Sequence, residues 1–351
     1  MKKHIFLFGI ALPLPEKISF LRFCTLCATF LILYMPLSQP TRANDSAVEV
    51  TPSGLQFKSI KDISIDKEEL SISRDRVEVI CHFRNQSTSD IVTEVAFPIP
   101  EYKWALLGRS VTNFSDFIVE VDGKKEPYKR EVKAFARGKD CTQILTDMNI
   151  SIVDFGKYES GFDPVMKRRY VTFVDRLKPT DKKTLIDLGI LRAFIEAEPD
   201  VVFPDWTVSI KYHWTQRFPA NKTLTIKHSY GPYAGFRSFC ARESDDIEFL
   251  RRHACINESF VSWMRKNGAM GSDCPWGFWV SYILTTANNW HGPIKDFRLT
   301  IEKKADEEVS TCFDPRIRLT GNNRYESRVR NFVPERDLKV FFFSSKGEVS
   351  R

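Results

Sequence analysis

The stretch TTANNWHGPIKDFRLTIEK, residues 285–303, holds side chains whose types could bind a ligand. Trp290 can stack on a ring and donate its N–H, and His291 can donate or accept a proton. Asn288 and Asn289 each offer an amide group. The same residues could instead form a corner, because asparagine stabilises turns and the Gly-Pro pair that follows ends strand pairing. Strand-like alternation on both sides favours the corner, and we keep the four side chains as candidate binding residues.

Two further aromatic residues, Tyr233 and Trp276, fall in loop-like contexts beside glycine and proline, where a side chain can face a partner. Trp206 and Trp214, in contrast, alternate with polar residues in one strand, so we assign them to the core. A tryptophan ring at a surface can stack on a ligand and donate a hydrogen bond. The loop candidates therefore predict a surface for an envelope protein or a glycan.

The histidine pattern argues against a shared metal site. His213 lies on the polar face of the segment 206–215, and His228 lies on the apolar face of the segment 223–230. Across the hairpin that these segments predict, the two rings would point apart. No G-x-S-x-G elbow accompanies the Ser, His and carboxylate residues. We therefore predict no catalytic residue, no metal and no cofactor. An alternative is a hydrolase of envelope polymers with carboxylates in an inter-domain cleft.

The charge pattern argues against nucleic acid as a partner. No Gly-rich phosphate loop precedes a helix, and no basic run is interleaved with aromatic residues. Residues 1–43 hold five basic groups and one acidic group, so without them the formal net charge of +7 falls by four to about +3. An excess of basic residues that comes largely from residues 1–43 does not indicate nucleic acid or acidic lipid as a partner.

Residues 1–43 have the pattern of a signal peptide. Two lysines precede a mostly apolar stretch, and Thr41-Arg42-Ala43 offers a small-residue cleavage site. Only about fifteen residues are strongly apolar, which is short for a membrane span. We expect cleavage near Ala43 and an exported protein, periplasmic or secreted. Retention of the segment as an anchor is the alternative, and it is the one membrane contact that we expect.

Six cysteines follow the predicted cleavage site, namely Cys81, Cys141, Cys240, Cys255, Cys274 and Cys312. An even number in an exported chain favours disulfides, although many pairings are open. No C-x-x-C pair occurs among them, so neither a zinc knuckle nor a thioredoxin-like site has its usual motif. Cys81 faces the apolar side of a strand, where it could also be a buried thiol.

Hydrophobic periodicity predicts a mainly β protein of the α+β type, with two antiparallel β-sandwich-like modules and a helical insert between them. The predicted divisions are a signal peptide at 1–43, an N-terminal β-sandwich at 44–134, a mostly helical insert at 135–200, and a C-terminal β-sandwich at 201–351 with helices near 244–267. Asp122 and Gly123 predict a tight hairpin turn. We expect Ser244 and Asn257 to cap the two short helices.

Several stretches resemble one family of exported bacterial proteins, known as domain of unknown function 4424. They are AFPIP at 96–100, HWTQRFPANKTLTIKHSYGPYAG at 213–235, the stretch 285–303 and STCFD at 310–314. The resemblance runs from about Asn44 to Phe343. Residues 84–101 and 117–132 also resemble the start of the vault/inter-alpha-trypsin domain, a β-sandwich interaction module.

The resemblance to the first family implies an exported protein without an established activity, so it transfers no catalytic residues. It also implies that Cys255 and Cys312 form a disulfide. Cys240 and Cys274 are additional and would pair across the helices between them, which leaves Cys141 as the only partner for Cys81. We therefore expect a non-enzymatic envelope protein that binds a protein or a glycan or has a structural role.

Overall fold

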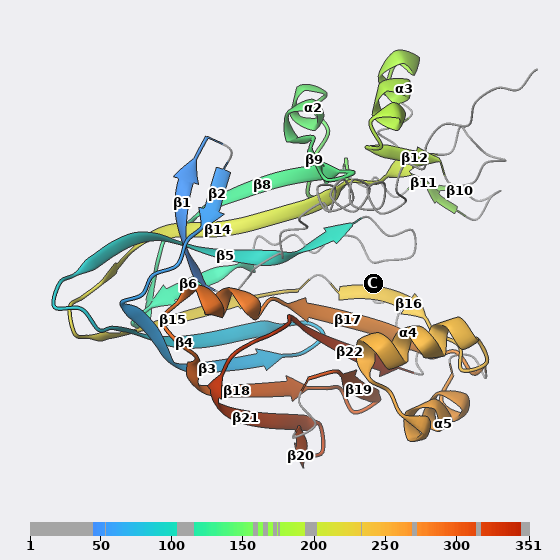
Figure 1. Ribbon diagram of the computed structural model, residues 1–351. Coiled ribbons are helices and arrows are strands. Elements are labelled where there is room, and N and C mark those ends of the chain that lie inside the picture. Colours follow the sequence, from blue (N-terminus) through green and yellow to red (C-terminus); the bar gives the residue numbers. More distant parts are fainter. Residues whose placement is uncertain are drawn as a thin grey trace, which may run out of the picture. The chain divides into compact units, whose positions relative to one another are not determined.

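The computed structural model describes most of the chain that follows the predicted signal segment (Figure 1). The described ranges are 45–52, 54–103, 116–156, 161–163, 168–170, 174, 176–193, 202–232, 234–268, 272–313 and 317–344. All of them belong to one compact unit, Thr41–Arg351. The predicted signal peptide, residues 1–43, lies outside the described residues.

The first sheet has six strands in the order β2-β1-β5-β14-β8-β9. Their bounds are β1 Ser46–Thr51, β2 Gly54–Phe57, β5 Ile91–Lys103, β8 Lys129–Ala136, β9 Lys139–Asp140 and β14 Thr207–Phe218. All of these pairings are antiparallel. Buried residues alternate with more exposed ones along β14, because successive side chains of a strand point to opposite faces. One face of this sheet is therefore turned to the core.

The second sheet has eight strands in the order β20-β21-β18-β3-β4-β15-β6-β7. Their bounds are β3 Ile63–Ile72, β4 Val77–Asn85, β6 Ile118–Val121, β7 Lys124–Lys125, β15 Thr223–Tyr230, β18 Ile294–Glu302, β20 Arg318–Gly321 and β21 Arg324–Phe332. β3 and β18 pair in parallel. At the turn between β6 and β7, Asp122 and Gly123 have φ angles of 48° and 77°. These left-handed conformations confirm the predicted tight hairpin.

The third sheet has four strands in the order β16-β17-β22-β19. Their bounds are β16 Ala234–Ser238, β17 Trp276–Tyr282, β19 Glu307–Thr311 and β22 Leu338–Ser344. Two separate strand pairs are β10 Gly161–Asp163 with β11 Arg168–Tyr170, and β12 Leu191–Ala193 with β13 Val202–Pro204.

The described helices are short, and two of them cover one face of the third sheet. Their bounds are α2 Thr142–Asp147, α3 Pro179–Asp187, α4 Ser244–Ala254, α5 Glu258–Lys266 and the 3-10 helix η5 Thr285–Asn289. α4 and α5 pack on Phe341 and Phe343 of β22. Asn257 caps α5 as predicted, because its side chain accepts a hydrogen bond from the backbone N–H of Phe260. The predicted cap Ser244 is instead the first residue of α4.

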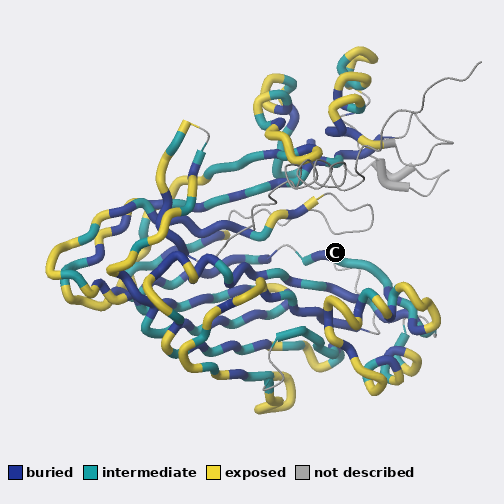
Figure 2. The backbone as a smooth tube through the Cα atoms, in the orientation of Figure 1, coloured by how far each residue is buried: buried dark blue, intermediate teal, exposed yellow. Residues whose placement is uncertain are grey.

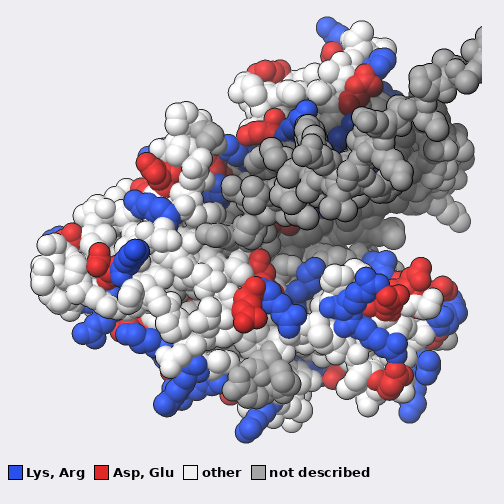
Figure 3. Space-filling view, in the orientation of Figure 1, with Lys and Arg blue, Asp and Glu red and all other residues white. Residues whose placement is uncertain are grey.

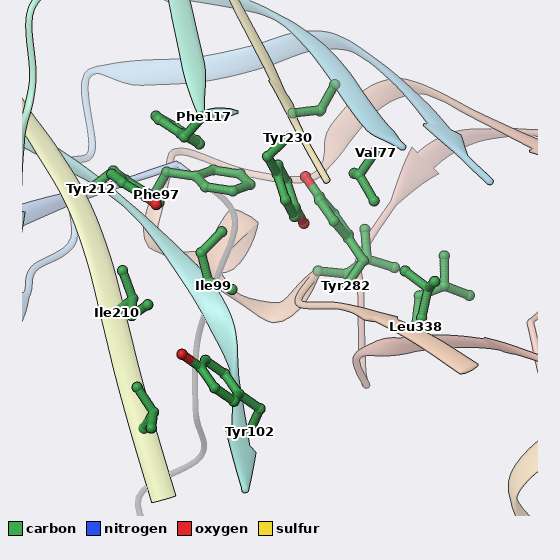
Figure 4. Packing of buried hydrophobic residues seen from close by; sticks show 14 of the residues in the cluster. Val77, Phe97, Ile99, Tyr102, Phe117, Ile210, Tyr212, Tyr230, Tyr282 and Leu338 are labelled. Carbon is green, nitrogen blue, oxygen red and sulfur yellow. The ribbon is translucent and has the colours of Figure 1, made fainter. Parts of the chain in front are cut away.

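The largest hydrophobic cluster joins the three sheets (Figure 4). Phe83 of β4 lies 5.9 Å from Phe218 of β14 between ring centroids. Phe97 of β5 lies 5.6 Å from Tyr230 of β15 and 6.3 Å from Tyr282 of β17. Figure 2 shows buried residues along the strands and exposed residues on helices and loops. The first two sheets therefore pack face to face, and the third sheet joins the same core.

The prediction of a mainly β fold is confirmed, but the two predicted modules share their sheets. β3 and β4 belong to the range 44–134, yet they lie between β18 and β15 of the range 201–351. β14 lies in the same way between β5 and β8. Alternation identifies the buried face of a strand, but it does not identify the neighbouring strand.

The predicted hairpin between residues 206–215 and 223–230 does not form. The first segment lies in β14 of the first sheet, and the second forms β15 of the second sheet. Both strands turn an apolar face to the same core from opposite sides, so their patterns look alike. The predicted mostly helical insert, 135–200, is also corrected, because its described residues combine α2 and α3 with short strands.

Two disulfides hold the helical part of the third sheet. They join Cys240 to Cys274 and Cys255 to Cys312, which confirms both expected pairs. Cys81 and the remaining Cys141 are buried free thiols, so the third pairing does not form. Burial raises the pKa of Cys141 to about 11, with a smaller contribution from the nearby Asp140 charge.

Candidate functional site

The stretch 285–303 connects β17 to β18, and its tryptophan faces inward. Trp290 is 4% exposed, and its ring centroid lies 5.0 Å from that of Phe83 and 6.0 Å from that of Phe218. Its Nε1–H donates to the backbone oxygen of Asp45. Trp290 therefore closes the core and fastens the start of the described chain, which is the structural interpretation of this stretch.

The neighbours of Trp290 hold other chain segments in the same way. The Nδ2 of Asn289 donates to the hydroxyl of Ser46 at 2.7 Å, and the Nδ2 of Asn288 donates to the backbone oxygen of Pro334 at 2.9 Å. His291 is exposed. Of the four candidates in this stretch, Trp290 and Asn289 are buried, and Asn288 and His291 are exposed, although Asn288 also holds Pro334.

A buried contact between a histidine and an aspartate lies close to this corner. The Nε2 of His228 is 2.7 Å from Oδ2 of Asp45, and both side chains are fully buried. The His228 ring also lies 4.7 Å from the Phe97 ring and 5.6 Å from the Phe117 ring. His213 lies in the other sheet, with its Nδ1 2.6 Å from Oε1 of Glu94. The two histidines therefore have separate carboxylate partners.

Of the other two predicted binding residues, one lies in a strand and the other lies outside the described residues. Trp276 belongs to β17, where its ring stacks on Phe236 at 4.8 Å with an interplanar angle of 18°. It is half-buried rather than displayed on a loop. Tyr233 lies outside the described residues.

A groove of about 280 Å³ opens between β5 and the paired strands β16 and β17. Its lining is residues 99–103 of β5, Gly235 and Phe236 of β16, Trp279 and Ser281 of β17, and the residues Tyr230 and Pro232. Most of these side chains are aromatic or aliphatic. Two stretches that carry the family resemblance, 96–100 and 213–235, meet at this groove.

The β5 wall of the groove is a sheet edge with an irregular backbone. β1 pairs with β5 only over Glu94–Ala96, and Pro98 and Pro100 follow beyond that point. Proline has no N–H to donate, so within sheets it occurs at edges and bulges. Pro100 and Glu101 both lie opposite Ser209 of β14, where the register shifts. Such a bulge redirects the side chains of the strand, here beside the groove.

The opposite wall carries a tryptophan ring held against a glycine. Gly235 of β16 pairs with Trp279 of β17, and a Cβ on Gly235 would lie only 2.0 Å from Cε2 of that ring. Glycine is therefore required for the close approach. Trp279 is half-buried, so part of its ring surface stays accessible.

Few polar groups line the groove. Partial loss of hydration raises the pKa of the Glu101 carboxyl, while the hydrogen bond from the Ser209 hydroxyl and the positive charge of Lys211 act to lower it. Tyr230 is 1% exposed, and burial raises its pKa. The Tyr230 hydroxyl makes no hydrogen bond with any described residue. Mostly apolar walls with a few polar groups are typical of sites for small ligands.

The acidic side chains of the groove and of the rest of the described chain can be compared with the needs of two kinds of site. Glu101 is the one carboxylate among its lining residues. A glycosidase needs two carboxyl groups about 5–10 Å apart across the scissile bond. In the described part of the chain, no cluster of three or more His, Cys, Asp or Glu side chains could hold a metal.

The visible surface of the helical part has charges of both signs (Figure 3). On α4, Arg252 pairs with Glu248, and Arg251 pairs with Glu258 of α5. Lysine and arginine are interspersed with aspartate and glutamate over these helices. Such a surface produces no strong field of one sign that would attract a highly charged partner.

The sequence did not reveal the groove because its aromatic residues have the pattern of core residues. Phe236 and Trp279 alternate in strands, as Trp214 does, and Tyr230 shares a face with buried neighbours. Two signals could have indicated it. Prolines within AFPIP mark an edge or a bulge, and Gly235 marks a place where another group approaches the backbone closely.

The fold defines a mainly β protein with antiparallel and mixed sheets, two disulfides and a small groove lined mostly by aromatic and aliphatic residues. The chain belongs to the family "Domain of unknown function (DUF4424)", whose model matches residues 43–341. The match confirms the resemblance to this family. The resemblance to the vault/inter-alpha-trypsin domain is not shown. No curated protein matches the chain.

The solved structures that match this chain have low sequence identity to it and low structural similarity. One is a Legionella pneumophila protein with the description "putative nutrient binding protein", with 14% identity, a TM-score of 0.42, and coverage of 86% of this chain and 70% of that chain. Another is the M1 zinc metallopeptidase from Deinococcus radiodurans, with 9% identity, a TM-score of 0.26, and coverage of 81% and 43%. Yeast LTA4 hydrolase has 10% identity, a TM-score of 0.28, and coverage of 90% and 32%. This chain spans less than half of each enzyme, and none of these likenesses supports an activity.

Proposed function

We propose that the protein is an exported, non-enzymatic binding protein of the bacterial envelope, with its ligand held in the groove between β5 and the strands β16 and β17. The observation that carries this proposal is the lining of the groove. A concave site with mostly apolar walls and a few polar groups matches the general pattern of small-ligand sites. Its volume of about 280 Å³ suits a ligand with a single ring.

Two disulfides indicate an oxidising, extracytoplasmic compartment, because cytosolic thiols are kept reduced. None of the helices in the described ranges is long and apolar enough to cross a membrane. A signal peptide cleaved near Ala43 and a periplasmic or secreted location are part of the proposal. The intact mass of the exported protein should correspond to a start near Asn44. A mass that still includes residues 1–43 would favour the anchor.

Binding is better supported than hydrolysis of envelope polymers. A hydrolase with two carboxylates would need a second acidic side chain facing Glu101, and the groove lining does not supply one. Lys103 also lies in the lining, 3.8 Å from Asp205 between charged atoms. The few polar groups can therefore orient a bound molecule without a pair of carboxyls to act on it.

Thermal unfolding in the presence of envelope components tests the proposal. A ligand at a hundred times its Kd stabilises a folded protein by about 2.7 kcal/mol, so binding raises the unfolding temperature. We expect at least one low-molecular-weight envelope fraction to produce this shift in the wild-type protein. Trp279→Ala should abolish the shift, whereas Leu319→Ala should keep it, because Leu319 is 58% exposed on β20. Equal shifts in both variants, or none in the wild type, would contradict the proposal.

A further inference from the structure

One polar group of the groove is left without a partner by the fold. Tyr230 ends β15, only 1% of it is exposed, and its hydroxyl makes no hydrogen bond with the rest of the described chain. Folded proteins pair nearly all buried polar groups, so each exception needs an explanation. Figure 4 shows the Tyr230 ring between the rings of Phe97 and Tyr282. Ile99 of β5 lines the same groove as Tyr230. A bound molecule could supply the missing partner.

Other tyrosine hydroxyls in this part of the molecule do have partners. The hydroxyl of Tyr102 donates to the backbone oxygen of Val153 at 3.0 Å, although Tyr102 also lines the groove. The hydroxyl of Tyr128 donates to the backbone oxygen of Phe117 at 2.9 Å. Tyr230 differs from these two tyrosines, because its hydroxyl has no partner among the described residues.

Trp279 offers a second, independent contact for a ring-shaped ligand. Gly235 holds this ring close to the backbone of β16, so its position is fixed before any ligand arrives. A rigid aromatic ring gives a large contact area at a small entropic cost. The apolar C–H face of a sugar ring is a matching surface.

The remaining lining argues against a peptide strand or an ion. Pro98 and Pro100 have no backbone N–H on the part of β5 that lies beyond its pairing with β1, and strand addition depends on such donors. The charges of Glu101 and Lys103 are opposite and cancel within the lining. A neutral molecule with several hydroxyl groups avoids both difficulties.

We propose that the groove binds a neutral pyranose, either free or at the end of a glycan, with a ring hydroxyl paired to Tyr230 and a ring face packed on Trp279. The proposal rests on the proposed binding function and names its ligand class. Ser281 and Glu101 offer further hydrogen-bonding groups. No covalent bond is made or broken in this binding.

Calorimetric titration with D-glucose, D-mannose, D-galactose and N-acetyl-D-glucosamine, each also as a disaccharide, tests the ligand class. We expect saturable binding of at least one sugar. Tyr230→Phe should weaken that binding roughly two- to tenfold, which is the value of one hydrogen bond. The unfolding temperature of the free Tyr230→Phe protein should not fall, because the deleted hydroxyl has no partner. Tyr128→Phe is the matched control, with a small loss of stability and unchanged affinity.

The outcomes separate this inference from the proposed function. If no sugar binds, but L-amino acids or short peptides bind and Trp279→Ala abolishes their binding, the sugar assignment is wrong and the groove function stands. If no member of either panel binds, the sugar assignment is wrong, and if no envelope fraction shifts the unfolding temperature of the wild-type protein either, the groove function is wrong as well. Unchanged sugar affinity in Tyr230→Phe, or a lower unfolding temperature of that free variant, would contradict the role given to its hydroxyl. A preference for the disaccharide over the free sugar would identify a glycan end as the source.

Discussion

Replacing Trp290 by alanine tests whether the corner at 285–303 is structural. The indole is 4% exposed, contacts Phe83 and Phe218, and donates its N–H to the backbone oxygen of Asp45. Alanine removes the ring from the core and also deletes the contact that fastens the first described residues. The change therefore affects both packing and the attachment of β1.

The expected loss can be estimated from the packing. Deleting a buried Trp or Phe side chain costs about 3–5 kcal/mol, because apolar contacts are lost and a cavity remains. Total stabilities of about 5–15 kcal/mol leave the Trp290→Ala protein folded but weakened. Trp290→Phe keeps most of the ring contacts and loses the N–H donor. It should cost less, about 1–3 kcal/mol, the range for an unsatisfied buried acceptor.

Urea unfolding followed by circular dichroism measures these differences as free energies of unfolding. His291→Ala is the control, because that side chain is exposed in the same turn and should change stability by less than about 0.5 kcal/mol. The ligand-induced thermal shift should persist in Trp290→Ala. A stable Trp290→Ala protein that has lost its ligand would refute the structural interpretation and make the corner the binding site.

Three further predictions concern other parts of the fold. Asn257→Ala should lower the free energy of unfolding by about 1 kcal/mol, because α5 loses its cap, and Asn257→Asp should retain most of it in the same urea assay. Burial raises the folded-state pKa of the Asp337 carboxyl, so the folded state favours its protonated form. The resulting contribution to stability is full below pH about 4 and is lost as the pH rises through the raised pKa. Asp337→Asn should remove this pH dependence from a curve of the free energy of unfolding against pH. Alkylation followed by intact-mass measurement should modify Cys81 and Cys141 only after unfolding, and rapid labelling of both in the native protein would disprove their burial.

Local chemistry was predictable from the sequence, whereas long-range pairing was not. The turn at Asp122-Gly123 and the Asn257 cap depend on a few neighbouring residues, and both occur as expected. The partner of β14 depends on strands far away in the chain, and alternation contains no information about them. β14 and β15 were therefore assigned to one hairpin, although they face each other across the core.

The candidate site shows the same limit. Trp290 and Asn289 have side chains that could bind a ligand, but the core and the first strand use them. Tyr230 and Trp279 look like core residues in the sequence, because alternation does not distinguish a buried residue from one that lines a groove. Tyr230 and Trp279 are recognised as groove residues only from the structure, in which β5 lies close to β16 and β17.

The central claim, that the groove is the binding site, is tested most directly by NMR. The 15N-labelled protein is titrated with a sugar that binds in calorimetry, and the amide shifts are mapped on the chain. The account predicts the largest changes at the lining residues that have an amide N–H, namely Ile99, Glu101, Tyr102, Lys103, Tyr230, Gly235, Phe236, Trp279 and Ser281. Changes concentrated at 285–293 instead, with the groove amides unmoved, would contradict it.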